Sequence, residues 1–153
     1  MRNRIPRSIF SIFAALILLA AIVAENALAR TSSSLVVQIP FDFQVAGKTL
    51  SAGRYVVERS TLFSADGLSL RNTEKKQSAF VLTSTVQSNL RQSESRLVFT
   101  RYKDQYFLSQ FWTSGEASGR ELIKSDRELS VERELAKAGV SPERVSVAAV
   151  QKK

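Results

Sequence analysis

Apolar residues alternate with other residues in two parts of this chain, and both parts predict β-strands. Between Leu35 and Val45 every odd-numbered residue is apolar, and a period of two is typical of a strand with one buried face. Pro40 lies within this run and has no N–H to donate, so we expect an edge strand or a bulge there. Residues 97–102 and 106–112 repeat the pattern around a short polar segment, which predicts a hairpin.

Shorter segments of the same kind complete a mainly β domain. Further strands are expected in residues 54–59, 61–63, 68–70 and 79–83. An Asp-Gly pair at 66–67 favours a hairpin turn between two of them. Short strands at this spacing predict a small antiparallel β-barrel or sandwich, a meander of about six to eight strands, over residues 35–121.

The period changes after the last of these strands, and the sequence then favours a helix over residues 122–139. Ser125 followed by Glu128 is a capping-box pattern, and Gly139 suits the position that follows a helix. Most side chains in the first part of this segment are charged or serine. We therefore expect the helix to pack on the β domain as a lid or brace with one face in water.

The segments on either side of this helix have weaker signals. Residues 113–120 contain two glycines and several polar residues, so we predict a loop. Residues 140–153 are predicted to be a tail, with a final strand at 145–150 as the alternative.

The start of the chain has the features of a secretory signal peptide. Three arginines precede an apolar run at 9–24, and Ala27-Leu28-Ala29 follows as a small-residue cleavage pattern. The run is 16 residues long, shorter than the roughly 20 that span a bilayer. We therefore expect residues 1–29 to be removed after Ala29 and residues 30–34 to form a flexible leader. The mature protein would then be periplasmic or secreted, with no transmembrane segment.

Charge narrows the choice of partner only a little. Removing the first three arginines and Glu25 changes 22 basic and 14 acidic residues to 19 and 13, a net charge of +6. A basic protein favours anionic partners such as lipid headgroups or acidic glycans. The charges are spread along the chain, so an ordinary basic surface is the competing explanation, and we expect no specific nucleic-acid binding.

The residues of the commonest active sites are missing. The chain has no histidine and no cysteine, which excludes disulfides, Ser-His and Cys-His catalytic pairs and the usual zinc ligands. Serine-nucleophile and phosphate-loop motifs are absent as well. We therefore expect a protein that is not an enzyme and that needs no metal or cofactor. The catalytic alternative is a carboxylate hydrolase, which would need two of Asp42, Glu58 and Glu94 in one cleft.

Aromatic and basic side chains gather on the second predicted hairpin. The candidate binding residues there are Arg101, Tyr102, Tyr106, Phe107 and Trp112. Rings interleaved with cations can form a stacking surface for a glycan or a single-stranded polymer. The same rings can equally be packing of a β-barrel core. The turn around Asp104 has no defined length in the sequence, so the pattern leaves open which rings point outward.

Several blocks of sequence occur in a recurrent order. They are Pro-Phe-Asp-Phe at 40–43, Gly-Lys-Thr-Leu at 47–50, Ala-Gly-x-Tyr at 52–55, Arg-Tyr-x-Asp-Gln-Tyr-Phe-Leu at 101–108 and Gly-Arg-Glu-Leu at 119–122. The pattern resembles an uncharacterised family of small exported proteins of acidobacteria-like environmental bacteria, over residues 37–138. Ser51 stands where that family commonly has proline, which should loosen one turn. The resemblance implies export and carries over no functional residues.

Two binding functions follow from these expectations. The first is a non-enzymatic exported protein that binds an apolar small molecule or a lipid in the barrel, since barrels of this size can enclose one ligand. The alternative is a surface-interaction module for an anionic glycan, a polymer or an envelope protein. Residues 40–59 serve neither directly, because their alternating Phe and Tyr residues and two glycine turns indicate a corner of the core.

Overall fold

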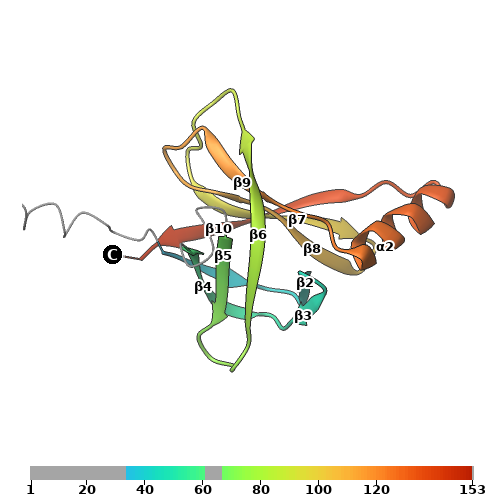
Figure 1. The fold of residues 1–153 in the computed structure, drawn as a ribbon, viewed down its shortest axis with the longest axis horizontal. Helices are drawn as coiled ribbons and strands as arrows, with labels where there is room; N and C mark the ends of the chain where they lie inside the picture. Colours follow the sequence, from blue (N-terminus) through green and yellow to red (C-terminus); the bar gives the residue numbers. More distant parts are fainter. Residues whose placement is uncertain (1–33, 61–66, 153) are drawn as a thin grey trace, which may run out of the picture. The chain divides into compact units, whose positions relative to one another are not determined.

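The computed structural model describes residues 34–60 and 67–152, and strands dominate this part of the chain (Figure 1). The strands are β1 (Leu35–Ile39), β2 (Phe43–Val45), β3 (Lys48–Leu50), β4 (Gly53–Ser60), β5 (Gly67–Asn72), β6 (Ser78–Gln87), β7 (Ser95–Tyr102), β8 (Gln105–Trp112), β9 (Ser118–Leu122) and β10 (Glu143–Gln151), and the helix is α2 (Asp126–Lys137). The predicted signal peptide, the predicted strand at 61–63 and Asp66 of the predicted Asp-Gly turn lie outside the described residues.

Eight of these strands close into an antiparallel barrel. Two meanders, β4–β5–β6 and β7–β8–β9, are joined on one side by the β6–β9 pairing. On the other side β10 and β1 lie between β7 and β4. The hairpin β2–β3 lies outside this ring and joins it through a parallel contact between β2 and β8. The predicted fold class, a small antiparallel β-barrel with a C-terminal helix, is confirmed.

The predicted tail is wrong, because residues 143–151 form strand β10. This strand pairs with β1 through Val37 and Ala149 and with β7 through Phe99 and Val145. Its partners are far away along the chain, so a local pattern gives only weak support for it. Val147, between those two residues, also packs on the core. The last described strand therefore closes the barrel.

The predicted loop over 113–120 is also partly wrong, because β9 begins at Ser118. The indole of Trp112 lies over Gly119, where an added Cβ would come 2.6 Å from Cε3 of the ring. A side chain at this position would collide with the indole, so glycine, a poor strand former, is required in the strand. The strand is specified by its neighbours and not by its own composition.

The long strand expected from Leu35 to Val45 is broken at Pro40. β1 ends at Ile39 and pairs with β4 and β10, whereas β2 begins at Phe43 and pairs with β3 and β8. Since proline cannot donate to a ladder, the chain leaves one sheet neighbour and meets another here. The bend turns Leu35–Val45 into a corner.

That corner contributes to an aromatic core, as predicted for residues 40–59. Phe43 packs edge-on against Tyr55 with ring centroids 5.3 Å apart and against Phe99 with centroids 5.4 Å apart. All three side chains are almost completely buried. The Tyr55 hydroxyl donates a 2.6 Å hydrogen bond to the carbonyl of Ser51, so the buried phenol is satisfied.

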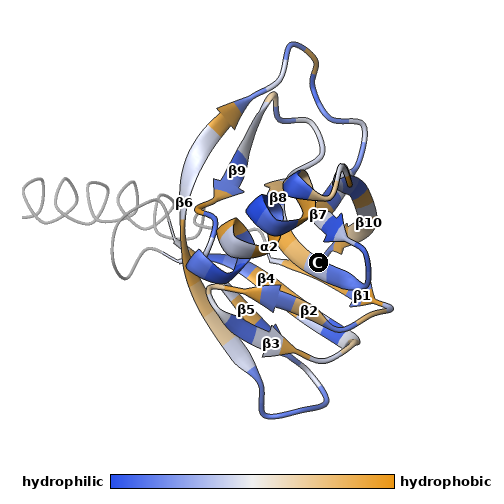
Figure 2. Cartoon of the chain, turned by 90° about the vertical axis from the view of Figure 1, so that its right-hand side faces the viewer, coloured by the Kyte–Doolittle hydropathy of each residue, from blue (hydrophilic) through white to orange (hydrophobic). Residues whose placement is uncertain are grey.

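The helix is shorter than the predicted range of 122–139, and it begins directly after the predicted capping serine, Ser125. The Ser125 side chain accepts a 3.2 Å hydrogen bond from the backbone N–H of Glu128, which is half of a capping box. Gly139 follows the helix with φ of 70°, a conformation that glycine adopts without strain. Leu135 packs on Tyr102 and Phe107, which attaches α2 to the outside of the β7–β8 hairpin. Figure 2 shows α2 in front of the sheet as a largely hydrophilic helix.

Within the described ranges, no helix is both long and apolar enough to cross a membrane.

Candidate functional site

Antiparallel strands give the barrel two different ends. The first end holds the end of β4, the end of β8 and the start of β7, and the second holds the start of β6, the end of β9 and the β7–β8 turn. Two of the cavities near the second end adjoin each other, because Leu122, the last residue of β9, lines both. The following residue, Ile123, lines one cavity, and Lys124 lines the other.

The larger cavity is apolar and has a volume of about 600 Å³. Its lining consists of Ala46, Phe80, Val81, Leu82, Leu122 and Ile123. Three of these side chains are unusually exposed for large apolar residues, with Phe80 at 39%, Leu82 at 55% and Ile123 at 73%. Exposed apolar groups that gather in one hollow indicate a binding surface more strongly than the same residues scattered singly.

This apolar cavity arises where two paired strands separate. The β6–β9 ladder ends at the pair Thr83–Leu122, although β6 itself begins five residues earlier at Ser78. The outward-facing Phe80 and Leu82 therefore lie beyond the end of β9. The chain beyond β9 leads to α2, which packs on β7 and β8.

The smaller cavity lies between α2 and the outer face of the barrel and has a volume of about 330 Å³. It is lined by Thr100, Tyr102, Ser109, Gln110, Glu121, Leu122, Lys124, Glu128, Glu132, Pro142 and Arg144. A bulge in β8 helps to build this wall, because the register between β7 and β8 shifts at Val98 and Phe99. Ser109 occupies the shift and donates a 2.9 Å hydrogen bond to the Val98 carbonyl. As a result Gln110 is on the outer face, next to Glu121 of β9.

Two side-chain oxygen atoms buried in this polar cavity lack a hydrogen-bond partner among the described residues. Glu128 is 4% exposed and Tyr102 is 2% exposed. Neither the Glu128 Oε1 atom nor the Tyr102 hydroxyl has a hydrogen-bond partner among residues 34–60 and 67–152. A buried polar atom without a partner costs about 1–3 kcal/mol, so such atoms are rare in folded proteins and point to a functional role.

Burial also changes how these groups titrate. Desolvation raises the pKa of Glu128 to about 7, with Lys124 opposing the rise and Glu132 adding to it. Desolvation likewise raises the pKa of Tyr102, which Lys124 lowers and Glu132 and Glu128 raise. Glu132 is close enough to perturb the Tyr102 hydroxyl but lacks the geometry of a hydrogen bond to it.

Three of the other charged groups around the cavity, Lys124, Glu132 and Glu121, have partners. Lys124 Nζ lies 2.6 Å from Glu132 Oε1, and this contact raises the pKa of Lys124. Gln110 Nε2 donates a 3.1 Å hydrogen bond to Glu121 Oε1. Of the three carboxyl groups that line the cavity, Glu121 and Glu132 are thus bonded to neighbouring side chains, whereas Glu128 has a buried oxygen without a partner.

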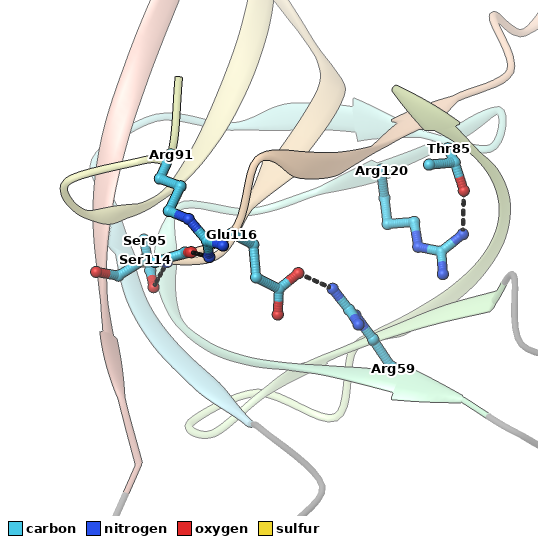
Figure 3. Close-up of polar contacts among 8 residues, drawn as sticks. Arg59, Thr85, Arg91, Ser95, Ser114, Glu116 and Arg120 are labelled. Carbon is cyan, nitrogen blue, oxygen red and sulfur yellow. Dashed lines mark hydrogen bonds and ion pairs between the residues drawn. The ribbon is translucent and has the colours of Figure 1, made fainter. Parts of the chain in front are cut away.

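The first end of the barrel is closed by a different set of polar contacts (Figure 3). Arg59 forms a 2.8 Å ion pair with Glu116, and Arg120 donates a 2.9 Å hydrogen bond to the Thr85 hydroxyl. Arg91 donates to the Gly115 carbonyl at 2.7 Å. Arg59, Arg91 and Arg120 are thus already engaged within the protein.

The structure does not bring the five predicted binding residues together on one surface. Neighbouring residues of a strand point to opposite faces, so Tyr102 and Phe107 face α2, and Arg101 and Tyr106 face the other way. The rings of Tyr102 and Phe107 meet edge-on with centroids 5.7 Å apart and are buried under Leu135. They form packing and not an exposed platform.

Arg101 and Tyr106 lie at the core-side face near the hairpin turn, which the register fixes as the two residues between Tyr102 and Gln105. The ring of Tyr106 stacks on Phe41 with centroids 3.8 Å apart. The Arg101 guanidinium lies 5.6 Å from the centre of the Tyr106 ring and forms a 3.3 Å ion pair with Glu143.

Trp112 is 6% exposed and donates a 3.1 Å hydrogen bond from its indole to Gln110.

The acids considered for hydrolysis lie on separate elements. Asp42 lies in the corner between β1 and β2, and its Oδ1 accepts a 2.7 Å hydrogen bond from the backbone N–H of Ala52. Glu58 lies on β4, and Glu94 lies in the loop before β7. Among the described residues, no cluster of acids is suited to hold a metal ion.

The residues that line the two cavities were missed in the sequence for identifiable reasons. Glu128 fits a capping box, so its carboxyl is expected at the helix start and in water. Phe80 and Leu82 lie in a short apolar run, which predicts a buried strand. The outward position of Leu82 follows from strict alternation with the buried Val81, and that alternation was the one signal available.

Comparison with known proteins finds no matching family model, no curated protein with significant similarity and no solved structure with a significant match.

Proposed function

We propose that this protein is an exported, non-enzymatic binding protein that holds an apolar small molecule, such as one with an acyl chain, in the cavity beside β6. The observation that carries the proposal is the exposure of Phe80, Leu82 and Ile123 around one hollow of about 600 Å³. Cavities for small ligands have volumes of about 300–1,000 Å³ and are mostly apolar. Covering these side chains would yield roughly 25 cal/mol per Å² of apolar surface.

The proposed ligand position differs from the barrel interior that the sequence favours. Phe43, Tyr55 and Phe99 fill part of that interior with rings in van der Waals contact. The cavity beside β6 lies at the wall, where Val81 and Leu122 belong to the core and Phe80 and Leu82 are exposed. A ligand there would contact the core without entering it.

The alternative, a surface module built on the aromatic hairpin, has less support. It needs rings that are free to stack on a partner, whereas Tyr102, Phe107 and Trp112 are each at most 6% exposed. Tyr106 is already stacked on Phe41.

Native mass spectrometry of the protein purified from an envelope fraction tests the proposal directly. We expect a bound small mass that is released on denaturation. Uptake of the neutral fluorescent probe N-phenylnaphthylamine gives a second readout. The Leu82→Asp variant should bind the probe about 10-fold more weakly or worse, because a charge replaces a ligand-contacting leucine.

The matched control is Leu90→Asp, because Leu90 is 76% exposed in a loop away from the cavity. It should bind the probe like the unmodified protein. A protein that carries no small mass and takes up no probe would overturn the proposal, and so would equal losses in both variants.

A further inference from the structure

The cavity under α2 holds a carboxyl group and a phenol that the fold buries without partners. Glu128 projects from the first turn of the helix, and Tyr102 projects from the end of β7. Both line the same hollow of about 330 Å³. The Glu128 Oε1 and Tyr102 hydroxyl oxygens can each accept a hydrogen bond, and no group in the described ranges supplies one. A ligand with at least two donors would satisfy both.

The charges around the hollow favour a cation as that ligand. Three carboxyl groups, from Glu121, Glu128 and Glu132, line it together with only two cations, Lys124 and Arg144. Lys124 is bonded to Glu132 and Arg144 is exposed. The remaining negative charge is on Glu128, in a protein that is basic as a whole. An added positive charge would balance the hollow, whereas an anion would meet three carboxyl groups.

An ammonium group suits the missing positive charge and the two unpaired acceptors better than a metal ion does. Its three N–H donors can reach two acceptors at once. No group of three metal-ligating side chains occurs in the part of the chain that the structure describes. The volume is near the lower limit of about 300 Å³ for small-molecule sites, so the hollow suits an amine of a few carbon atoms.

We propose that the cavity under α2 binds a small primary amine, whose ammonium group donates hydrogen bonds to Glu128 Oε1 and to the Tyr102 hydroxyl. This second site is independent of the apolar ligand proposed for the cavity beside β6.

Binding is coupled to a proton. Burial holds the pKa of Glu128 at about 7, with Lys124 lowering it and Glu132 raising it. Tyr102, Glu121 and Arg144 are the other titratable groups that face the same hollow. An ammonium ion selects the carboxylate form, because an opposite charge nearby favours ionisation. At pH 6 the free carboxyl is mostly protonated, so an amine that binds there must release close to one proton. At pH 9 the carboxyl is already ionised while a simple alkylamine is still charged, and no proton is released.

Isothermal titration calorimetry of the purified protein with n-butylamine tests the proposal. Titrations at pH 6 and pH 9, each in two buffers of different ionisation enthalpy, count the protons released. The neutral isostere n-butanol reports what the alkyl chain contributes alone. We expect saturable binding of n-butylamine at one site, no binding of n-butanol, and proton release at pH 6 only.

Substitutions locate the site. Glu128→Gln should weaken n-butylamine binding roughly 10- to 100-fold, because the amide oxygen can still accept a hydrogen bond but the negative charge opposite the ammonium group is lost, and it should abolish the proton release. Tyr102→Phe should weaken binding by a smaller factor. Glu134→Gln is the matched control, because Glu134 lies on the same helix and is exposed, and it should bind normally. Circular dichroism melting confirms that each variant is folded.

Three results would overturn the proposal: no binding of n-butylamine to the unmodified protein, equal binding of n-butanol, or equal losses in Glu128→Gln and Glu134→Gln. Equal binding of n-butanol would assign the hollow to neutral hydroxyl compounds. Because Leu82→Asp leaves this hollow intact, failure here is distinguishable from failure of the apolar site.

Discussion

The two ends of the barrel both contain charged and hydroxyl side chains, but these side chains differ in whether they have hydrogen-bond partners. At the first end, Arg59 is paired with Glu116, and Arg120 is bonded to Thr85. At the second end, Glu128 and Tyr102 are more deeply buried, yet the Glu128 Oε1 atom and the Tyr102 hydroxyl have no partner in the described residues. At the first end the polar groups thus bond to one another, whereas at the second end two buried oxygen atoms are left without a partner, which is the basis of the proposed amine site. Polar groups that are hydrogen-bonded and near water have little effect on the free energy of unfolding, whereas buried polar groups without a partner lower it.

The largest expected effect, and so the strongest test of this difference between the two ends, comes from the titration of Glu128. Its pKa is about 7 in the folded protein, against an ordinary value of 4.5. At a pH between these two values Glu128 is therefore ionised in the unfolded chain but still largely protonated in the folded protein. Stability should therefore fall by about 3 kcal/mol as the pH rises from about 4.5 to about 7, and then level off. Glu128→Gln should remove this fall. Urea unfolding followed by Trp112 fluorescence at a series of pH values measures it.

Glu134→Gln is the control for this titration, since it removes an exposed carboxyl from the same helix. It should keep the pH dependence of the unmodified protein. Parallel pH curves for the unmodified protein and Glu128→Gln would contradict the assignment.

Gly119→Val should affect both ends together, because β9 (Ser118–Leu122) carries Arg120, which is bonded to Thr85, and Leu122, which lines both cavities. The new side chain would collide with the Trp112 indole, whose Cε3 atom lies 2.6 Å from the position of an added Cβ. We expect a loss of about 1–3 kcal/mol, as is usual for overpacking. Chemical denaturation measures the loss, and near-ultraviolet circular dichroism reports on the indole.

A double substitution checks the cause of that loss. In a protein that already carries Trp112→Ala, Gly119→Val should cost much less, because the colliding ring is gone and the two effects are coupled. Simple addition of the two losses would show that Gly119 matters for another reason.

Lys124→Met should raise the pKa of Glu128 while leaving Glu128 itself in the cavity. Lys124 lowers the pKa of Glu128, and its loss also frees Glu132, which raises that pKa. Both changes act in the same direction, so the Glu128 midpoint should move to higher pH. Carbon-detected NMR of the glutamate carboxyl groups measures the midpoint.

Lys137→Met, at the far end of the helix, should leave the midpoint in place. A midpoint that falls in Lys124→Met would contradict the proposed arrangement of charges.

Arg59→Met should have the smallest effect, even though it breaks an ion pair with a short distance of 2.8 Å. Both partners are more than a third exposed, and exposed pairs contribute about 0–1 kcal/mol and weaken in salt. Thermal unfolding at low and high salt should show a small loss at low salt that vanishes at high salt. A loss larger than that of Gly119→Val would mean that the first end depends on this pair.

Local patterns were enough where each element is specified by its own residues. The capping serine and following glycine placed α2 to within a few residues of its observed bounds, and alternation placed the strands on either side of Asp104. The corner between Phe43 and Tyr55 was predicted because phenylalanine, tyrosine and the turn glycines lie close together in sequence.

Local patterns failed where the partner of a residue is far away in sequence. β10 pairs with the first described strand and with β7, so its short apolar alternation is interpretable only when both neighbours are known. β9 contains a glycine that is required by Trp112. The five candidate binding residues, which are close together in sequence, lie on two opposite faces of the hairpin, because neighbouring residues of a strand point to opposite sides.

By itself, the sequence determined the class of fold, the helix near its end and the absence of histidine and cysteine chemistry, because composition, period and capping are properties of neighbouring residues. Only the tertiary structure decided that the last described strand closes the barrel, that Phe80, Leu82 and Ile123 surround a hollow, and that the Glu128 carboxyl is buried. These features depend on which surfaces meet after folding. Burial, and with it the pKa of an acid and the exposure of an apolar side chain, is set by contacts between residues that are remote along the chain.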